Sequence, residues 1–247
     1  MSGIVILSGL VLWEVAARAG WIARIFFPPP TTIFLTLVKM GGTSELWASA
    51  GMTIYRLTAG VAIGGTAGLL LGLIMGANRL VRVTLNPFVA AMHPLPKLAI
   101  LPIFMVLLGI GETSKIALVA LTAFFPMLIN TLAGVQQIDR TYWEVATNYG
   151  ATGSVMLRRI ILPGSLPLAL TGLRLAVNGA LVVTVAVEML SARQGLGTQI
   201  WMAWQTMRTE EMYATLVVIG FLGLLINVAI EFITMCLLPW QAKDNSL

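Results

Sequence analysis

Few side chains in this 247-residue sequence could take part in covalent or metal chemistry. The chain has one histidine, His93, and one cysteine, Cys236, and they lie in distant apolar segments. No His-Glu-x-x-His pattern occurs, and catalysis or metal binding needs several such groups brought together at one place. The sequence therefore predicts no catalytic residue, no metal site and no cofactor bound to this chain, and it disfavours an intramembrane enzyme.

The remaining candidates are polar residues inside long apolar segments, where a charge is costly and marks a functional position. Five residues of the predicted span 166–190 lie four, three, four and three residues apart: Arg174, Asn178, Leu181, Val185 and Glu188. That spacing places them on one face of a helix. We expect Arg174, Asn178 and Glu188 to line a passage for a polar solute. The alternative is that Arg174 and Glu188, near opposite ends of the span, each pair locally or extend their charged groups toward the membrane interface.

A second candidate region is the span 86–108, which its own prolines interrupt. His93-Pro94-Leu95-Pro96-Lys97 and then Pro102 remove hydrogen bonds from any helix that forms there. Discontinuous helices of this kind often border substrate pathways in transporters. The sequence makes His93 and Lys97 candidates for the pathway. A packing role for His93, and a Lys97 side chain that reaches the membrane interface, are the alternatives.

The second apolar span carries a stripe of small residues for helix packing. Its members are spaced four apart: Gly60, Gly64, Gly68, Gly72 and Gly76. Close backbone approach across small residues is a principal source of packing energy between helices in lipid. The stripe predicts tight packing inside a bundle or at a dimer interface, either static or sliding during transport.

A polar interlude, residues 139–163, separates two long apolar segments and has the features of a short surface helix. Thr141 and Glu144 have the spacing of a capping box at a helix start. Gly150 suits the left-handed residue that ends such a helix. We interpret the interlude as a cytoplasmic surface that docks another protein, the alternative being a capped surface helix that docks nothing.

Composition indicates an all-α, polytopic membrane protein. Hydrophobic residues make up 58% of the chain and charged residues 10%, and the net charge of +5 is dispersed, which argues against nucleic-acid binding. About six transmembrane helices are predicted, near residues 4–23, 53–76, 86–108, 115–134, 166–190 and 213–238. The first is interpreted as a retained span and not a signal peptide. Residues 26–47 should form a short amphipathic segment at the outer surface. One transmembrane domain, 1–247, then accounts for the chain.

An even number of spans places both termini on one side of the membrane. Predicted loops on that side contain the following cationic residues: Arg79, Arg82, Arg140, Arg158, Arg159 and Lys243. The opposite loops contain Arg24, Lys39, Arg193 and Arg208, with Lys115 at a border. The asymmetry weakly favours cytoplasmic termini.

The interlude also carries a recognisable pattern: E-x-A, three residues, G-A, and later I-x-L-P. The matching positions, with a neighbouring cation, are Glu144, Val145, Ala146, Gly150, Ala151, Arg158, Ile160 and Pro163. The pattern resembles the signature of the membrane subunits of ATP-binding-cassette (ABC) importers, although Val145 replaces an alanine of that signature. Trp13-Glu14, Pro28-Pro29-Pro30, Leu101-Pro102 and Glu188 with Gly195-Leu196-Gly197 extend the resemblance to the nitrate, sulfonate, taurine and bicarbonate permeases. His93 stands where that group commonly has arginine.

This resemblance implies a type I ABC importer permease fold and a bacterial inner-membrane location. It also implies a homodimer that carries two ATPase subunits on its docking loops and receives substrate from an extracytoplasmic binding protein. ATP and magnesium would bind the ATPase, since this chain has no G-x-x-x-x-G-K phosphate loop. The implied substrate is a small organic or anionic nutrient, either sulfonate-, taurine- or nitrate-like or a heterocyclic vitamin precursor. A self-contained secondary transporter or channel is the alternative, which would leave the docking helix unexplained.

Overall fold

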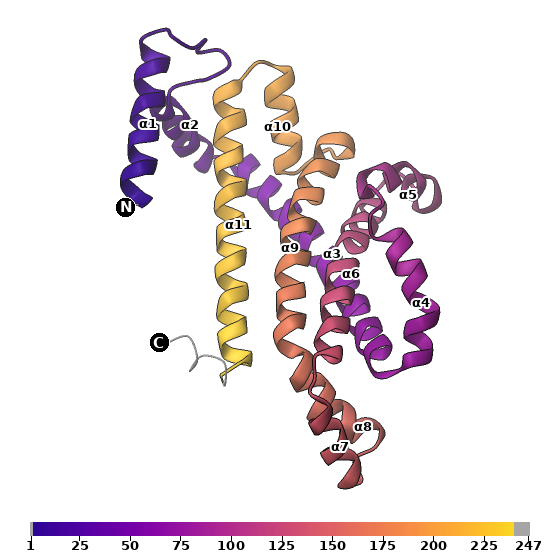
Figure 1. Cartoon of the computed structure of the whole chain (residues 1–247). Coiled ribbons are helices and arrows are strands. Elements are labelled where there is room, and N and C mark those ends of the chain that lie inside the picture. The colour runs from indigo at the N-terminus through magenta and orange to yellow at the C-terminus, as the bar shows by residue number, and fades with distance from the viewer. Residues whose placement is uncertain (1, 240–247) are drawn as a thin grey trace. The chain divides into compact units, whose positions relative to one another are not determined.

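The computed structural model describes residues 2–239, and this part of the chain is helical without strands (Figure 1). The helices are α1 (Ser2–Arg18), α2 (Pro30–Gly41), α3 (Ser44–Ala77), α4 (Arg79–Met92), α5 (Leu101–Leu108), α6 (Glu112–Gln136), α7 (Arg140–Asn148), α8 (Gly153–Met156), α9 (Leu162–Ser191), α10 (Leu196–Gln205) and α11 (Thr209–Leu237). A 3₁₀ turn, Lys97–Ile100, precedes α5, and a π turn, Leu157–Ile161, joins α8 to α9. Lys243, counted above among the cytoplasmic cations, lies outside the described residues.

Four stretches of helix in the described chain are long and apolar enough to cross a membrane. They are Ser44–Ala77, Glu112–Gln136, Gly153–Ser191 and Thr209–Leu237. The pair Arg79–Met92 and Lys97–Leu108 would form a fifth span, and it is bent by 92° at the predicted proline break. α1, with 17 residues, is slightly shorter than the roughly 20 residues that cross a hydrocarbon core.

The boundary near residue 53 was predicted too late along the chain. α3 begins at Ser44 and is 34 residues long, because Glu45, Trp47 and their neighbours continue the helix beyond the apolar stretch. The short amphipathic segment predicted within residues 26–47 corresponds to α2, which starts at Pro30 and buries Ile33. Proline at the first helical position costs no hydrogen bond, since that N–H has no partner inside the helix.

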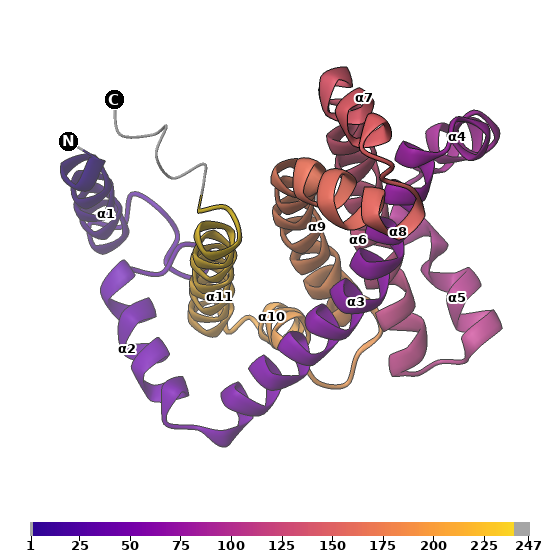
Figure 2. The same cartoon turned by 90° about the horizontal axis from the view of Figure 1, so that it is seen from below.

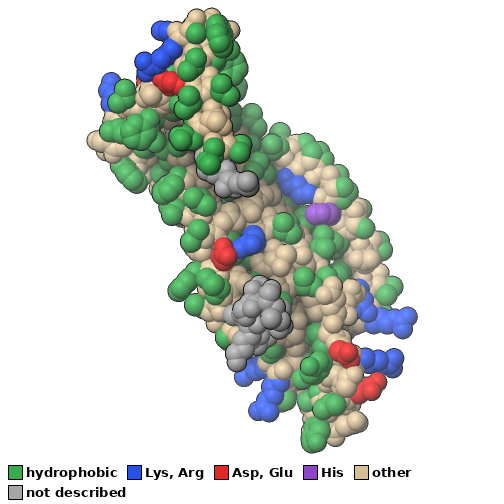
Figure 3. Space-filling model, turned by 60° about the vertical axis from the view of Figure 1, so that its left-hand side comes forward, with side chains coloured by type: hydrophobic (Ala, Val, Ile, Leu, Met, Phe, Trp, Pro, Cys, Tyr) green, Lys and Arg blue, Asp and Glu red, His purple; other side chains and the backbone are tan. Residues whose placement is uncertain are grey.

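The chain divides into two compact units, and long helices contribute to both. One contains the residues up to Tyr55 together with Val185–Leu224. The other contains Arg56–Thr184 together with the described residues 225–239. Hydrophobic side chains cover much of the face drawn in Figure 3, and α11 exposes large apolar residues such as Phe221 and Phe232. Such surfaces suit contact with lipid or with further helices.

The second unit is organised around α6, which packs against the glycine stripe of α3. A Cβ added at Gly64 or Gly68 would collide with the backbone carbonyl oxygen of Ala120 or Phe124, and at Gly72 it would lie 2.8 Å from that of Leu128. Cβ atoms at Gly60 and Gly76 would collide with valine side chains of α6. The predicted tight packing inside a bundle is confirmed for these five glycines.

α9 approaches the other side of α6 through glycines as well. A Cβ added at Gly134 of α6 would lie 2.8 Å from the Ser165 carbonyl oxygen, and one at Gly172 of α9 would lie 3.1 Å from that of Pro126. The views in Figures 1 and 2 agree in placing α3, α6 and α9 side by side in this unit. α6 is accordingly the densely buried helix of the unit, and it includes the fully enclosed side chains of Leu118, Val119 and Leu128.

Candidate functional site

The docking loop begins with a helix cap that differs from the predicted one. Asp139 is the N-cap of α7, and its carboxylate accepts a hydrogen bond of 2.7 Å from the Thr141 backbone N–H. The predicted capping box of Thr141 and Glu144 is therefore wrong. Thr141 lies inside the first turn, and the Glu144 carboxylate instead contacts Arg140, one turn earlier, at 3.2 Å.

The cap also sets the charge of Asp139 at this exposed site. Hydrogen bonding by the Thr141 side chain, and then by its backbone N–H, lowers the pKa of the Asp139 carboxyl below its ordinary value of 3.8. The carboxylate therefore stays ionised at neutral pH, beside the positive end of the α7 dipole.

The end of α7 has the left-handed glycine that the sequence predicts. Gly150 has φ +76°, and its N–H donates to the Thr147 carbonyl oxygen at 2.9 Å. The Ala151 N–H donates to Ala146 O at 2.9 Å. These two hydrogen bonds form a Schellman motif, which satisfies the last carbonyl groups of the helix and turns the chain sharply. The conformation predicted for Gly150 is confirmed.

A small apolar cluster holds the docking loop on the membrane helices. Leu73 of α3, Val135 of α6 and Ile161 of the π turn form its buried centre, and Trp143 of α7 and Met156 of α8 pack against it. Figure 1 shows α7 and α8 beyond the ends of α6 and α9. The loop therefore connects directly to α3 and α6, the two helices that the glycine stripe holds together.

The rest of α7 carries exposed side chains without protein cover in this chain. Within α7, Trp143 is partly buried and Ala146 is buried. The side chains of Tyr142, Val145 and Tyr149 are 64%, 49% and 89% exposed. A cavity of about 450 Å³ lies between the start of α7 and the start of α9, and Arg159, Ile160 and Pro163 are among its lining residues. A short helix that shows aromatic and apolar side chains beside a cavity and cations suits contact with another protein.

The broken span brings His93 and Lys97 together. His93 is the C-cap of α4, and the Lys97 ammonium donates to its carbonyl oxygen. Both side chains border Phe125 of α6, with the His93 ring centroid at 5.7 Å and the Lys97 Nζ at 5.4 Å from the Phe125 ring. The break is confirmed, and a role for either residue in translocation stays a prediction.

The polar stripe of α9 is divided between separate partners. Asn178 and Asn227 of α11 exchange side-chain hydrogen bonds of 3.4 and 3.1 Å. One turn away, the Arg174 guanidinium lies 4.0 Å from the Glu231 carboxylate, and both side chains are about half exposed. The sequence offers no signal that links these positions of α9 and α11, so the pairing could not be predicted.

Glu188 is fully buried in the other unit, where it holds a loop. Its carboxylate accepts hydrogen bonds of 2.9 Å from the Thr53 hydroxyl and from the Gly197 N–H, and Thr53 in turn accepts from the Leu196 N–H at 3.0 Å. These bonds satisfy free amides at the start of α10. A Cβ at Gly195 would collide with the Glu188 side chain, so Gly195-Leu196-Gly197 is the backbone that leaves room for this carboxylate. Arg174 and Glu188, near the two ends of the stripe, thus have separate local partners, and a role of either residue in translocation stays a prediction.

A buried ion-pair group escaped the sequence analysis. Arg56 of α3 donates to both carboxylate oxygens of Glu112, at 2.6 and 3.0 Å, and Lys115 adds a contact of 2.9 Å. The Arg56 side chain is 2% exposed. Arginine in an otherwise apolar span was the available signal, but its partner lies 56 residues away.

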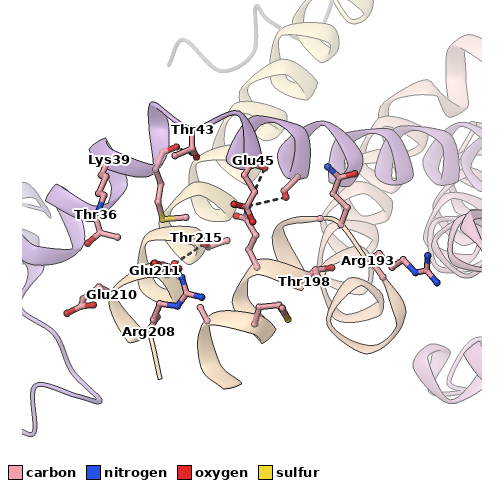
Figure 4. Close-up of a pocket in the computed structure, with 18 residues that line it drawn as sticks. Thr36, Lys39, Thr43, Glu45, Arg193, Thr198, Arg208, Glu210, Glu211 and Thr215 are labelled. Atoms are coloured by element: carbon pink, nitrogen blue, oxygen red, sulfur yellow. Dashed lines mark hydrogen bonds and ion pairs between the residues drawn. The ribbon is translucent and has the colours of Figure 1, made fainter. Parts of the chain in front are cut away.

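The unit that contains Glu188 also has a cavity of about 930 Å³ with mixed charge (Figure 4). α2, the start of α3, the loop after α9, α10 and the start of α11 all line it. Lys39, Arg193 and Arg208 are its cations, and Glu45, Glu210 and Glu211 are its carboxylates. Arg208 and Glu211 pair with each other at 3.2 Å. The cavity borders the C-terminal end of α9, whereas the docking loop precedes the N-terminal end of this helix.

Comparison with known proteins agrees with this arrangement. A family model described as "Binding-protein-dependent transport system inner membrane component" matches residues 64–242. The putative aliphatic sulfonates transport permease protein SsuC of Bacillus subtilis is 31% identical over 232 residues, which are 94% of this chain and 84% of the relative. The taurine transport system permease protein TauC of Escherichia coli is 31% identical over 239 residues, 95% of this chain and 87% of that protein.

Two further likenesses concern a different cargo and the fold. The formylaminopyrimidine transport permease protein ThiX of Halalkalibacterium halodurans is 31% identical over 236 residues, 95% of this chain and 93% of the relative. A solved structure of the MetNI methionine ABC transporter in an inward facing conformation matches with a TM-score of 0.63 at 21% identity, over 78% of this chain and 94% of that chain.

The chain belongs to the family of binding-protein-dependent transport system inner membrane components. It is a permease of an ABC importer with the type I ABC importer permease fold, and a multi-pass protein of the inner membrane. Its relatives are transport permease subunits and not enzymes.

Proposed function

We propose that two copies of this chain form the substrate passage of an ATP-driven importer. Two ATPase subunits, which bind ATP and magnesium, attach to the loop 139–163, and an extracytoplasmic binding protein delivers the substrate. Both termini then lie in the cytoplasm. The family membership supports the class of transporter, and the geometry of the docking loop supports the attachment of the ATPase.

The observation that carries the proposal is the two-sided construction of α7. Trp143 packs into the apolar cluster on α3 and α6, while Tyr142, Val145 and Tyr149 face outward. A partner that moves α7 therefore pulls on the centre of the helix bundle. Closure of the ATPase subunits on ATP would draw the two docking loops together and open the passage outward, and hydrolysis would reset it.

The proposed substrate is a small organic or anionic nutrient. The relatives are named for aliphatic sulfonates, taurine and formylaminopyrimidine, so the family accommodates both sulfonates and a heterocyclic vitamin precursor. The exposed polar groups of α9 and α11, Arg174, Asn178 and Glu231, could contact such a solute. We expect His93 and Lys97, at the bend of the broken span, to border the same passage.

The proposal is tested by changing the one backbone position that shapes the docking loop. Gly150→Val should uncouple the permease, because a β-branched residue resists the left-handed conformation at φ +76°. Gly150→Asn is the matched control, since asparagine adopts that conformation readily. Both variants should insert into the membrane at wild-type levels.

The measurements are co-purification of the ATPase with the permease, and substrate-stimulated ATP hydrolysis in reconstituted vesicles. We expect the valine variant to lose both and the asparagine variant to keep both. A valine variant that keeps full coupling would refute the docking assignment. Uptake by the isolated permease in a proton or sodium gradient would instead favour the secondary transporter.

A further inference from the structure

The polar contacts between α9 and α11 form a compact group at a depth where both helices are otherwise apolar. Arg174 contacts Glu231, and one turn further along, Asn178 contacts Asn227, as the register of two antiparallel helices requires. No other charged residue occurs between residues 166 and 187 or between 212 and 237. Arg174 lies about 18 Å along α9 from its first residue, and Glu231 lies about 9 Å along α11 from its last residue.

Among the described residues, two arginine–glutamate pairs join different long helices, Arg56–Glu112 and Arg174–Glu231, and they are built differently. Arg56 holds Glu112 with two short hydrogen bonds and is almost fully buried. Arg174 reaches Glu231 through one 4.0 Å contact, with side-chain exposures of 47% and 65%. Charge-assisted N–H···O bonds are about 2.7–2.9 Å long, so the second pair is an ionic contact without a hydrogen bond. Arg56 and Glu112 are built to stay together, whereas Arg174 and Glu231 can accept new partners.

The free hydrogen-bonding capacity of the looser pair defines the chemistry of a ligand. A guanidinium group presents parallel N–H donors that match the two oxygens of a carboxylate or sulfonate. Among the described residues Arg174 makes no hydrogen bond, so this fork is available to an oxyanion. The Glu231 carboxylate lies beside it as the present counter-ion.

Charge balance then selects between a simple anion and a zwitterion. A monoanion that replaces Glu231 on Arg174 leaves the Glu231 carboxylate without a counter-ion and next to a like charge, which is costly at this depth. A short zwitterion brings an ammonium group of its own, which pairs with the displaced Glu231 carboxylate. The pair between Arg174 and Glu231 is then replaced by two pairs, one between Arg174 and the oxyanion and one between Glu231 and the ammonium group. The net charge inside the membrane does not change.

We propose that Arg174 and Glu231 form an intramembrane binding site for a short zwitterion that carries an oxyanion and an ammonium group. Arg174 binds the oxyanion, Glu231 binds the ammonium, and the contact between them closes the empty site. Asn178 and Asn227 offer neutral amide groups at the next turn, about 6 Å along the helices. This inference rests on the proposed function, because it places the site in the substrate passage.

The test compares two ligands that differ in one group, taurine and isethionate, in which a hydroxyl replaces the ammonium. Binding is measured calorimetrically on the permease purified with its ATPase in lipid nanodiscs, without binding protein. The wild-type protein should bind taurine more tightly. Glu231→Gln should weaken taurine binding about ten- to hundred-fold, the value of a charge-assisted hydrogen bond, and should tighten isethionate binding.

The two other variants separate a binding role from a structural one. Arg174→Gln should weaken the binding of both ligands. Arg174→Lys keeps the charge without the paired N–H donors of the guanidinium group, and it should weaken their binding less. Arg18→Gln is the control, since it removes an exposed ion pair of α1 and should change neither affinity. ATPase co-purification and helical circular dichroism confirm that each variant is folded and assembled.

Glu231→Gln is expected to change the affinities for taurine and isethionate in opposite directions, and this expectation makes the proposal refutable. A pair that only holds the helices would affect both ligands in the same direction, and that result would overturn the proposal. Wild-type protein that binds neither ligand up to millimolar concentration while the ATPase co-purifies would also overturn it and leave the proposed function standing. Loss of the ATPase from wild-type preparations would count against the proposed function, and the affinity pattern would still decide the site.

Discussion

Two neighbouring glycines of α3 should respond in opposite ways to the same substitution. Gly64→Ala places a methyl group against the backbone of α6, 2.6 Å from the carbonyl carbon of Ala120 and 2.8 Å from its Cα. Gly65→Ala adds the same methyl group where the nearest atom outside its own backbone surroundings, Val61 Cγ1 of the same helix, is 3.9 Å away. The pair therefore separates the effect of close helix approach from that of helix propensity.

The expected magnitude for Gly64→Ala follows from the distances. Carbon atoms pack at about 3.5–4.0 Å, so α3 and α6 must separate locally by about 1 Å. Each contacting pair of atoms contributes about 0.1–0.2 kcal/mol of dispersion energy, and a gap of this size removes a quarter to a half of that energy. Summed over several tens of atom pairs, the loss is about 2 kcal/mol. Overpacked cores lose about 1–3 kcal/mol. Gly65→Ala should instead be neutral or gain up to about 1 kcal/mol.

The assay is the free energy of unfolding of the purified permease, obtained by titrating mixed micelles with a denaturing detergent. We expect the two variants to differ by about 2–3 kcal/mol, with Gly64→Ala the less stable. Ala120→Gly should not rescue it, because the colliding group is a backbone carbonyl. In contrast, Val119→Gly should relieve much of the clash in Gly60→Ala, because the two nearest atoms are the Cγ1 and Cβ of that valine, whereas Val119→Ala keeps the Cβ at 2.6 Å and should not. Equal stability of the Gly64 and Gly65 variants would refute the packing argument.

Three further predictions concern the contacts outside the glycine stripe. Gly197→Ala should raise hydrogen exchange at the start of α10, measured by mass spectrometry, because its Cβ would collide with the α9 backbone; unchanged exchange would contradict this. Glu112→Gln should cost roughly 2 kcal/mol or more by removing the counter-charge of a buried arginine, whereas Glu211→Gln, in an exposed pair, should cost under about 1 kcal/mol. The stability that the Asp139 cap gives to the start of α7 should be fully present above the unfolded pKa near 3.8. It should be lost as pH falls through the lower pKa of the folded state. The measurement is the protection of the Thr141 amide against hydrogen exchange, relative to the intrinsic exchange rate at each pH. The control is Asp139→Asn, in which the cap has no titrating group.

The sequence predicted features that a residue's own backbone chemistry determines. Gly150 is the residue of its loop that adopts a left-handed conformation without steric cost, and two prolines within three residues, Pro94 and Pro96, disfavour a continuous helix. The cap of α7 was misassigned because Asp139 and Thr141 are both good N-cap residues, and the choice depends on where Ile138 and the end of α6 place the chain.

The contacts that organise the candidate sites were beyond sequence reasoning, since their partners lie far apart in the chain. Thr53 and Glu188 are 135 residues apart, and Asn178 and Asn227 are 49 apart. Helical periodicity places Arg174 and Glu188 on one face of α9, but it does not say that one is half exposed and the other fully enclosed. That distinction requires knowing which helix covers each turn.

The glycine stripe has a consequence for how substitutions can accumulate in this protein. At Gly64 and Gly68 the nearest opposing atom is a main-chain carbonyl oxygen of α6, which every amino acid provides, and at Gly72 the Leu128 carbonyl oxygen and the Thr131 Cβ are equally near at 2.8 Å. The packing therefore demands glycine on α3 while making no demand of its own on the side chains at positions 120, 124 and 128. We expect a saturation-mutagenesis scan to show an asymmetric record across this interface, with α3 intolerant at every fourth residue and the facing positions of α6 restricted only by their other neighbours.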